Sequence, residues 1–284
     1  MAVGEAPSGL FERAQGVVLS EAPHSQALTR IPVLWLGIDN VSFHEAAEAV
    51  LEMCRSGRAA YVVTPNLDHF MRTRRDQVLR TVYEKADLSV ADGVPVLWAS
   101  RILGRPLKGR VNGTDLFEGL CAAAAREGLR VFLLGGAPGV AESAKEVLQK
   151  RYAGLSIVGA SSPVIDASGK GPDDELTIRQ IRAVQPHLLF TAFGCPKQEL
   201  WMARNSKLLG PMVCIGVGGS FDLVAGYLRR APRWMQRFGL EWLWRLVQEP
   251  HRLWKRYLVE DVPFFWCLGL EVIRSLAAPS QGAR

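Results

Sequence analysis

The stretch LRVFLLGGAPGVAESAKEVLQKRY, residues 129–152, predicts a strand, a glycine-rich turn and a helix in direct succession. Its first eight residues are an almost continuous apolar run, typical of a strand that is buried on both faces of a parallel sheet. From Val140 to Tyr152, apolar residues recur with the period of a helix and fall on one face. A chain that repeats such units folds as an α/β domain.

The same alternation of strand and helix patterns extends from residue 33 to about residue 219. We predict seven strands: VLWLGID (33–39), AYVVTPN (60–66), LSVADG (88–93), LRVFLLGG (129–136), LSIVGA (155–160), HLLFTAFG (187–194) and MVCIGVGG (212–219). We therefore expect residues 31–226 to form a Rossmann-like, doubly wound α/β core with a mostly parallel sheet.

The composition changes after Gly226, which predicts a helical C-terminal appendage over residues 227–276. Between residues 229 and 256 there are eight Lys or Arg residues and two acids, and five of the eight tryptophans lie between 234 and 266. We expect two or three helices here, with breaks at Pro232 and Pro250. Residues 1–30 lack the pattern of a signal peptide and are predicted to be a mobile leader, and residues 277–284 a frayed tail.

The overall composition indicates a protein that works inside the cell and binds an anionic partner. The 284 residues carry a formal net charge of +6, which favours phosphate, nucleic acid or an acidic membrane surface as the partner. The five cysteines show no C-x-x-C spacing, as expected of free, buried thiols in a reducing compartment. No uncharged apolar run approaches the roughly 18 residues that span a bilayer, so we expect a soluble or peripheral protein.

Polar and glycine-rich residues follow several predicted strands, at the edge where ligands bind to parallel sheets. Thr64 and Asn66 follow the second strand, and Asp92 follows the third. The glycines of GGAPG follow the fourth, and Gln198 follows the sixth, within GCPKQE. The last strand runs into GVGGSFD (216–222).

Two of these strand ends have an ordinary structural interpretation beside the functional one. Gly135, Gly136 and Gly139 would let backbone N–H groups approach a phosphate, but glycines at such turns also serve steric needs alone. Gln198 could bind a ligand hydroxyl, or it could simply favour the start of a helix. The residues alone leave both alternatives open.

Asp92 is a stronger candidate, because aspartate is unfavourable inside a strand. It is either the N-cap of a helix over residues 94–104 or a functional acid. A carboxylate can take a proton from a sugar hydroxyl, and the guanidinium of nearby Arg110 can hold a phosphate oxygen. An enzyme that acts on a phosphate-bearing ligand, with Asp92 as its base, fits this pair.

Eight blocks of the sequence, in order and spacing, resemble the WecG/TagA/CpsF family (glycosyltransferase family 26). The similarity covers roughly residues 33–260. The blocks are TPNLDHF, ADGVPVLWASRILG, RVNGTDLF, FLLGGAPGVAESA, AFGCPKQELW, GVGGSFDLVAG, RAPRW and GLEWLWRLVQEPHRLWKRYL.

The resemblance implies an inverting glycosyltransferase in cell-surface polysaccharide synthesis, such as that of teichoic acid or exopolysaccharide. Its donor would be a UDP-sugar, often of N-acetylmannosamine, and its acceptor an undecaprenyl-diphosphate-linked saccharide. Asp92 would be the catalytic base, Thr64 and Asn66 would lie in its pocket, Arg110 would face phosphates, and Gln198 would line the cleft.

The resemblance also implies that the appendage docks on the inner face of the cell membrane and brings arginines over the nucleotide. The candidates are Arg230, Arg233, Arg245 and Arg252. Tryptophans beside basic residues suit an anionic lipid surface. Self-association through this appendage stays open.

We expect no cofactor and no metal, because Asp173–Asp174 is interpreted as a solvated helix start rather than a metal-binding pair. A dinucleotide-dependent oxidoreductase would need an acid after the strand 155–160 to bind a ribose, and the next acid is only at Asp166. A nucleic-acid-binding module would leave Thr64, Asn66 and Asp92 unexplained, so we expect no nucleic-acid partner.

Overall fold

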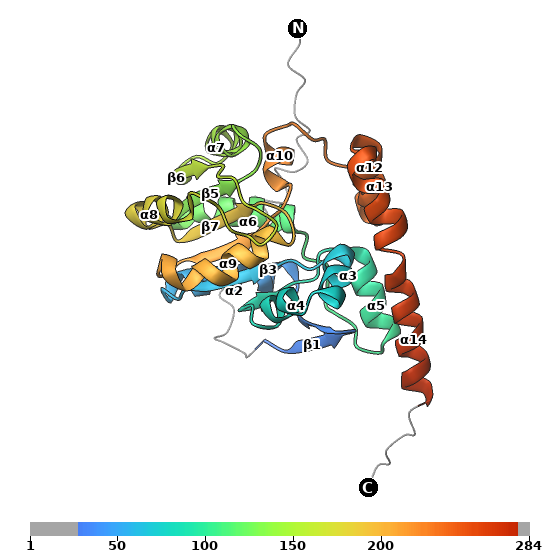
Figure 1. Cartoon of the computed structure of the whole chain (residues 1–284). Helices are drawn as coiled ribbons and strands as arrows, with labels where there is room; N and C mark the ends of the chain where they lie inside the picture. Colours follow the sequence, from blue (N-terminus) through green and yellow to red (C-terminus); the bar gives the residue numbers. More distant parts are fainter. Residues whose placement is uncertain (1–27, 278–284) are drawn as a thin grey trace.

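The computed structural model describes residues 28–277, and its centre is a six-stranded sheet (Figure 1). The strand order is β4-β3-β8-β7-β5-β6, and every neighbouring pair is parallel. The strands are β3 (Ala60–Val63), β4 (Leu88–Ser89), β5 (Arg130–Gly135), β6 (Ser156–Ser161), β7 (Leu188–Ala192) and β8 (Val213–Gly216). The predicted α/β fold with a parallel sheet is confirmed. Most of the predicted leader and tail lies outside the described residues.

The predicted strand over residues 33–39 is wrong. The chain there forms a separate antiparallel hairpin of β1 (Arg30–Val33) and β2 (Leu36–Asp39). Leu34 adopts a left-handed conformation with φ 52°, so the apolar run conceals a turn without glycine or proline. Asp39 joins the hairpin to the sheet, because its Oδ2 accepts a hydrogen bond from the N–H of Ser89 at 2.7 Å.

Helices cover both faces of the sheet and bury two apolar cores. One core lies between the sheet and α2, α6 and α7, and the other between the sheet and α3, α4, α5, α8 and α9. Successive residues of β3 alternate between them: Tyr61 and Val63 face one core and Val62 the other. The helices are α2 (Phe43–Arg55), α3 (Leu67–Arg75), α4 (Gln77–Glu84), α5 (Val94–Ile102), α6 (Gly113–Glu127), α7 (Val140–Arg151), α8 (Asp174–Val184), α9 (Lys197–Leu209) and α10 (Ser220–Val224).

The C-terminal helices form a column along one side of the core (Figure 1). They are α11 (Arg233–Arg237), α12 (Glu241–Gln248), α13 (Pro250–Lys255), the π-helical turn η2 (Arg256–Glu260) and α14 (Pro263–Ala277). Pro232 precedes α11 and Pro250 begins α13, as expected of residues that interrupt helices. The column is attached to the core through Phe264, which is fully buried and packs edge-on against Phe70 of α3. Within residues 28–277, no helix combines the length and apolarity needed to cross a membrane.

Candidate active site

Asp92 lies just beyond the carboxyl end of β4, beside the end of β3. Its backbone N–H donates to the carbonyl of Pro65 at 3.0 Å, which ties the two strand ends together. Helix α5 begins at Val94, and its N-cap is Gly93, whose φ of 128° suits glycine. The alternative that Asp92 caps this helix is therefore wrong, and its carboxylate is available for other contacts.

The N-terminus of α6 brings Asp92 and Thr64 together. A Cβ atom placed on Gly113 would lie 3.5 Å from Thr64 Oγ1 and 3.6 Å from Asp92 Oδ2. The other carboxylate oxygen, Oδ1, accepts a hydrogen bond from Asn112 Nδ2 at 3.1 Å. Thr64 is buried, and its hydroxyl donates to the carbonyl of Gly216 at the end of β8 at 3.2 Å. Three strand ends and one helix start thus converge on this carboxylate.

The surroundings of Asp92 make it a better base than an ordinary aspartate. Burial raises its pKa to about 6, and the carboxylate of Glu241 adds to this effect. The charges of Arg110 and Arg245 and the N–H of Gly113 act in the opposite direction. An acid with this pKa is ionised at neutral pH and can accept a proton from a hydroxyl group.

Arg110 and Arg245 bring positive charge toward Asp92 from two different elements, and we call the space edged by these three residues the crevice. Arg110 follows α5 and its Nη1 pairs with Oε2 of Glu241, at the start of α12, at 2.5 Å. Arg245 lies one turn further along α12. Its guanidinium is 3.7 Å from the position that a Cβ of Gly219 would occupy, at the start of α10. The appendage therefore places two charged residues, Glu241 and Arg245, near Asp92.

Asn66 lies in the same crevice and contacts the appendage. It caps α3 by accepting the N–H of His69 at 3.4 Å, and its Oδ1 lies 3.4 Å from Nη2 of Arg256 in η2. Arg256 also pairs with Asp68 at 3.3 Å, and Arg72 holds both oxygens of Asp68 at 3.0 and 2.9 Å. Burial alone would raise the pKa of Asp68, but the charges of Arg256 and Arg72 outweigh it and lower this pKa.

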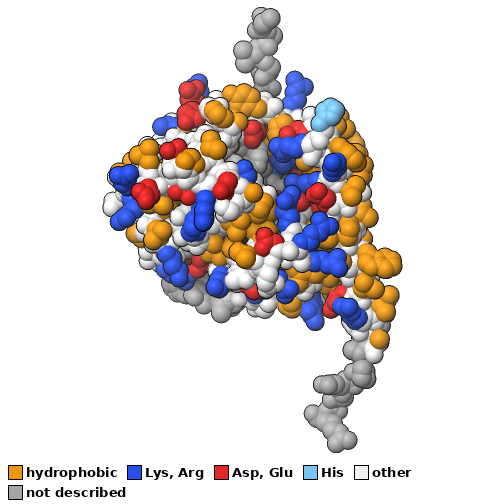
Figure 2. Space-filling model, in the orientation of Figure 1, with side chains coloured by type: hydrophobic (Ala, Val, Ile, Leu, Met, Phe, Trp, Pro, Cys, Tyr) orange, Lys and Arg blue, Asp and Glu red, His pale blue; other side chains and the backbone are white. Residues whose placement is uncertain are grey.

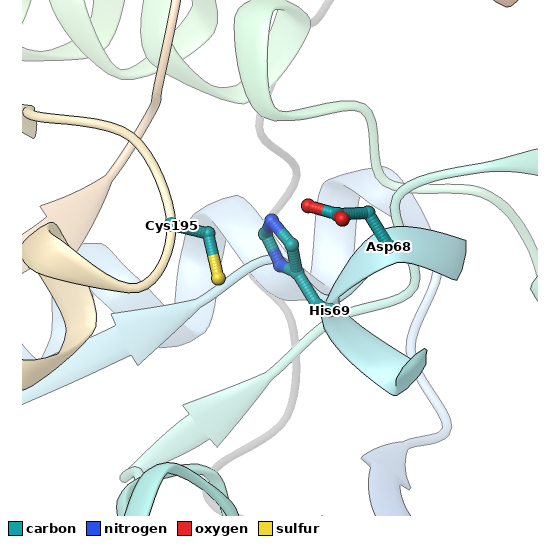
Figure 3. A group of neighbouring side chains, drawn as sticks. All are labelled: Asp68, His69 and Cys195. Carbon is teal, nitrogen blue, oxygen red and sulfur yellow. The ribbon is translucent and has the colours of Figure 1, made fainter. Parts of the chain in front are cut away.

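Asp68 and His69, both buried, form a cluster with half-buried Cys195, and the potential ligand atoms of the three lie within 4.8 Å of one another. Figure 3 shows the three side chains converging from α3 and from the loop before α9. Burial lowers the pKa of His69 to about 3, and its Nδ1 lies 2.8 Å from the hydroxyl of Tyr83. Arg72 and Arg256 already pair with Asp68, so a cation at this cluster would have to compete with both guanidinium groups for the carboxylate.

Gln198 is buried and connects two strand-end loops. Its Oε1 accepts the N–H groups of Gly194 at 3.2 Å and Gly218 at 3.1 Å, while its Nε2 donates to Glu199 at 2.8 Å. Gln198 thus fixes the loops after β7 and β8 relative to each other.

The glycine-rich loop after β5 lies several strands away from Asp92. With strands about 4.8 Å apart, the ends of β4 and β5 are separated by about 19 Å. A Cβ on Gly135 would lie 2.9 Å from the backbone of Ala192, and one on Gly136 3.2 Å from Val140, so close packing explains both glycines. Gly139, with φ 84°, is the exposed N-cap of α7.

The remaining predicted arginines occupy different surroundings. Arg230 pairs with Asp115 of α6 at 2.5 Å, which attaches the start of the appendage to the core. Arg233 is exposed on α11. The Arg252 side chain is 64% exposed and pairs with Glu249 of the neighbouring turn, so the structure does not bring it to the crevice.

Sequence comparison identifies the protein family. Residues 31–278 match the sequence profile described as "Glycosyl transferase WecG/TagA/CpsF family". The chain belongs to this family of glycosyltransferases.

Relatives of this glycosyltransferase include proteins of Bacillus and Staphylococcus. A protein of Bacillus spizizenii is 32% identical over 78% of this chain and 83% of its own length. A protein of Bacillus subtilis is 32% identical over 70% and 75%, and one of Staphylococcus aureus 29% identical over 83% and 90%. Each is named N-acetylglucosaminyldiphosphoundecaprenol N-acetyl-beta-D-mannosaminyltransferase.

Sequence reasoning missed four residues that shape the candidate active site of this glycosyltransferase. They are Asp68, Asn112, Glu241 and Arg256. One signal was available: asparagine directly before a helical pattern, as in RVNGTDLF, is a favoured N-cap. The pairings of Glu241 and Arg256 join residues more than 100 positions apart, and no local pattern indicates them.

Proposed function

We propose that this chain is an inverting transferase that moves an N-acetylmannosaminyl residue from a UDP-sugar to an undecaprenyl-diphosphate-linked N-acetylglucosamine. The observation that carries this proposal is the ionisable Asp92, at a crevice edged by arginines from both core and appendage. The names of the relatives supply the sugar and the acceptor. The product would enter the synthesis of a cell-wall polymer.

The proposed reaction is a single displacement. Asp92 takes the proton of the acceptor hydroxyl while that oxygen bonds to the anomeric carbon of the donor sugar. The bond from this carbon to the UDP oxygen breaks, and UDP leaves with the electron pair. Because the oxygen enters opposite the leaving group, the configuration at the anomeric carbon inverts.

The leaving UDP gathers negative charge, which Arg110 and Arg245 are positioned to stabilise. In this structure Arg110 is paired with Glu241, so a donor phosphate would compete with that carboxylate. Thr64 and Asn66 line the space next to the proposed base. Gln198 would keep the loops after β7 and β8 in place around it.

We further propose that the appendage rests on the anionic inner face of the cell membrane. Figure 2 shows basic side chains along the side of the column that faces the core, and apolar side chains along its outer edge. The exposed apolar residues of the column include Trp234, Phe238, Trp242, Val247, Trp254, Leu258, Val259, Val262, Phe265, Trp266 and Ile273. Exposed tryptophans in such a series suit the headgroup region of a bilayer.

A nucleic-acid-binding function is not favoured by this arrangement. Arg230 and Arg256 of the basic region pair with acids of the core, and Arg110 of the core pairs with Glu241 of the appendage. A phosphate backbone would have to break these three pairs, whereas a donor diphosphate at Arg110 competes with Glu241 alone. Tight, salt-sensitive binding of an oligonucleotide would support the rejected function.

The decisive experiment is a screen of UDP-sugars with an undecaprenyl-diphosphate-linked N-acetylglucosamine acceptor. We expect release of UDP and extension of the acceptor with UDP-N-acetylmannosamine. Extension with a different UDP-sugar would correct the donor, and no extension with any of them would contradict the function.

We predict that kcat/KM falls on the acid side of about pH 6, because Asp92 must be ionised to accept a proton. Below this pH, activity should decrease about tenfold per pH unit. Release of UDP measured at subsaturating substrate from pH 5 to 8.5 checks this, with protein integrity followed by circular dichroism. A kcat/KM that does not change between pH 5 and pH 8.5 would contradict the role of Asp92 as the base.

We also predict that turnover needs no divalent metal, because arginines are available to stabilise the leaving diphosphate. Activity should stay within about twofold of its original value in excess EDTA. The matched control is the same assay with Mg²⁺ or Mn²⁺ restored. Loss of turnover in EDTA that either ion restores would show that a metal takes part.

A further inference from the structure

Asn112 contacts both the start of α6 and the carboxylate of Asp92. Its Oδ1 accepts the N–H groups of Thr114 at 3.0 Å and Asp115 at 3.2 Å, which caps the helix. Its Nδ2 donates to Oδ1 of Asp92 at 3.1 Å. One amide side chain therefore links a helix terminus to the proposed base.

The cap determines which way the amide faces. Only its oxygen can accept backbone N–H groups, so a rotation by 180° would place an NH₂ group against two other donors. With the oxygen on the helix, the NH₂ group must point at Asp92. The helix terminus thus ensures that Asp92 receives a donor and never a competing acceptor.

Two backbone hydrogen bonds fix the chain segments that carry Asn112 and Asp92. The N–H of Val111, directly before Asn112, donates to the carbonyl of Ala91 at 2.9 Å. The N–H of Asp92 donates to Pro65 at 3.0 Å. Both residues are therefore fixed at the backbone as well as by their side chains.

We propose that Asn112 is a positioning residue for the transfer reaction: it holds Oδ1 of Asp92, keeps Oδ2 toward Gly113 and Thr64 for the proton of the acceptor, and favours the ionised carboxylate. This inference rests on the proposed role of Asp92 as base. A hydrogen bond to the charged form of a carboxylate opposes the effect of its burial. Without this bond, Asp92 would be protonated at higher pH and its carboxylate could rotate.

The test uses two variants that keep a capping residue but remove the donor. Ser and Asp are both good N-caps, so Asn112→Ser and Asn112→Asp should preserve α6. Neither offers an NH₂ group to Asp92, and Asp adds a second negative charge. Arg110, Glu241, Arg245 and the Gly113 N–H, which also act on Asp92, are the same in both variants.

For Asn112→Ser we expect the acid limb of kcat/KM to move upward by about one pH unit. The kcat/KM of the variant would then be about fivefold below that of the natural protein at pH 6, and the difference would become small by pH 8.5. We expect KM for the donor to change little. Asn112→Asp should move the limb further. The matched control is Asp76→Ser, an N-cap exchange on α4, which should leave the limb in place.

An unmoved acid limb in both Asn112 variants would overturn the inference, whether or not activity falls, because a purely structural cap predicts that result. The role of Asp92 is tested separately. If Asp92→Asn is inactive while both Asn112 variants keep the wild-type pH profile, only the role of Asn112 fails. If Asp92→Asn remains active, the proposed base itself is wrong.

Discussion

Asp92→Asn should fold normally and transfer sugar about 10²–10⁴ times more slowly than the natural protein, the usual range for loss of a general base. The amide has nearly the same shape as the carboxylate but cannot take a proton. Initial rates of UDP release at pH 7.5, normalised to folded protein, measure the effect. The matched control is Asp173→Asn, an exposed aspartate in the loop before α8, which should keep full activity.

The same variant should be more stable than the natural protein above pH 6. Because the pKa of Asp92 is raised on folding, the folded protein binds its proton more tightly than the unfolded chain does. The ionised carboxylate therefore destabilises the fold above about pH 6, and this effect disappears below its ordinary pKa of 3.8. A pKa raised from 3.8 to about 6 corresponds to about 3 kcal/mol, and we expect roughly 2 kcal/mol because solvent screens a half-buried side chain.

Urea unfolding of both proteins at pH 4 and pH 7.5 measures this pH-dependent difference in stability. Higher stability with lost activity identifies Asp92 as a residue that serves the reaction at the expense of the fold. Activity within threefold of the natural protein, at equal folded fraction, would exclude it as the base.

Removal of residues 227–284 should abolish binding to anionic vesicles and reduce transfer to a lipid-linked acceptor by at least about 100-fold. The truncation removes Arg245 from the crevice and leaves Arg110 without Glu241. The removed region also carries the exposed tryptophans Trp234, Trp242, Trp254 and Trp266, which suit the headgroup region of a bilayer. Vesicle sedimentation and UDP release measure the two effects.

Truncation also uncovers Phe70, against which Phe264 packs, so a second variant is needed. Trp254→Gln combined with Trp266→Gln changes two exposed tryptophans, 45% and 72% accessible, and leaves the pairs with the core intact. It should lose most vesicle binding but keep turnover on a water-soluble acceptor analogue. The control Leu208→Gln, at an exposed position of α9, should change neither. Unchanged vesicle binding in the double variant would contradict the proposed membrane face.

The sequence predicted six strands of the sheet, because each is a buried apolar run followed by a helix pattern. It failed at residues 33–39, where Leu34 turns the chain without glycine or proline. It also identified Asp92, Thr64 and Asn66 as neighbours, since the carboxyl ends of parallel strands meet at one edge.

The rest of the crevice depends on long-range contacts. Gln198 follows a strand like the other site residues, yet its amide is consumed by the N–H groups of two loops. Glu241 and Arg256 belong to a region whose composition indicated an excess of positive charge but not which residues would pair with the core. Their partners, Arg110 and Asp68, are set by how the appendage lies on the core, which no local pattern encodes.

Helix α12 has two opposite sides with different contacts. Glu241 and Arg245, one turn apart, face the core, whereas Trp242 and Val247 are exposed. An α-helix with its side chains is about 10 Å across. If the outer side rests on the bilayer as proposed, α12 is a spacer that sets the height of the reacting hydroxyl above the lipid headgroups. A sugar joined directly to the diphosphate would reach that height, whereas a longer saccharide would carry its end past the crevice, so the thickness of one helix would limit the enzyme to the first additions on its lipid carrier.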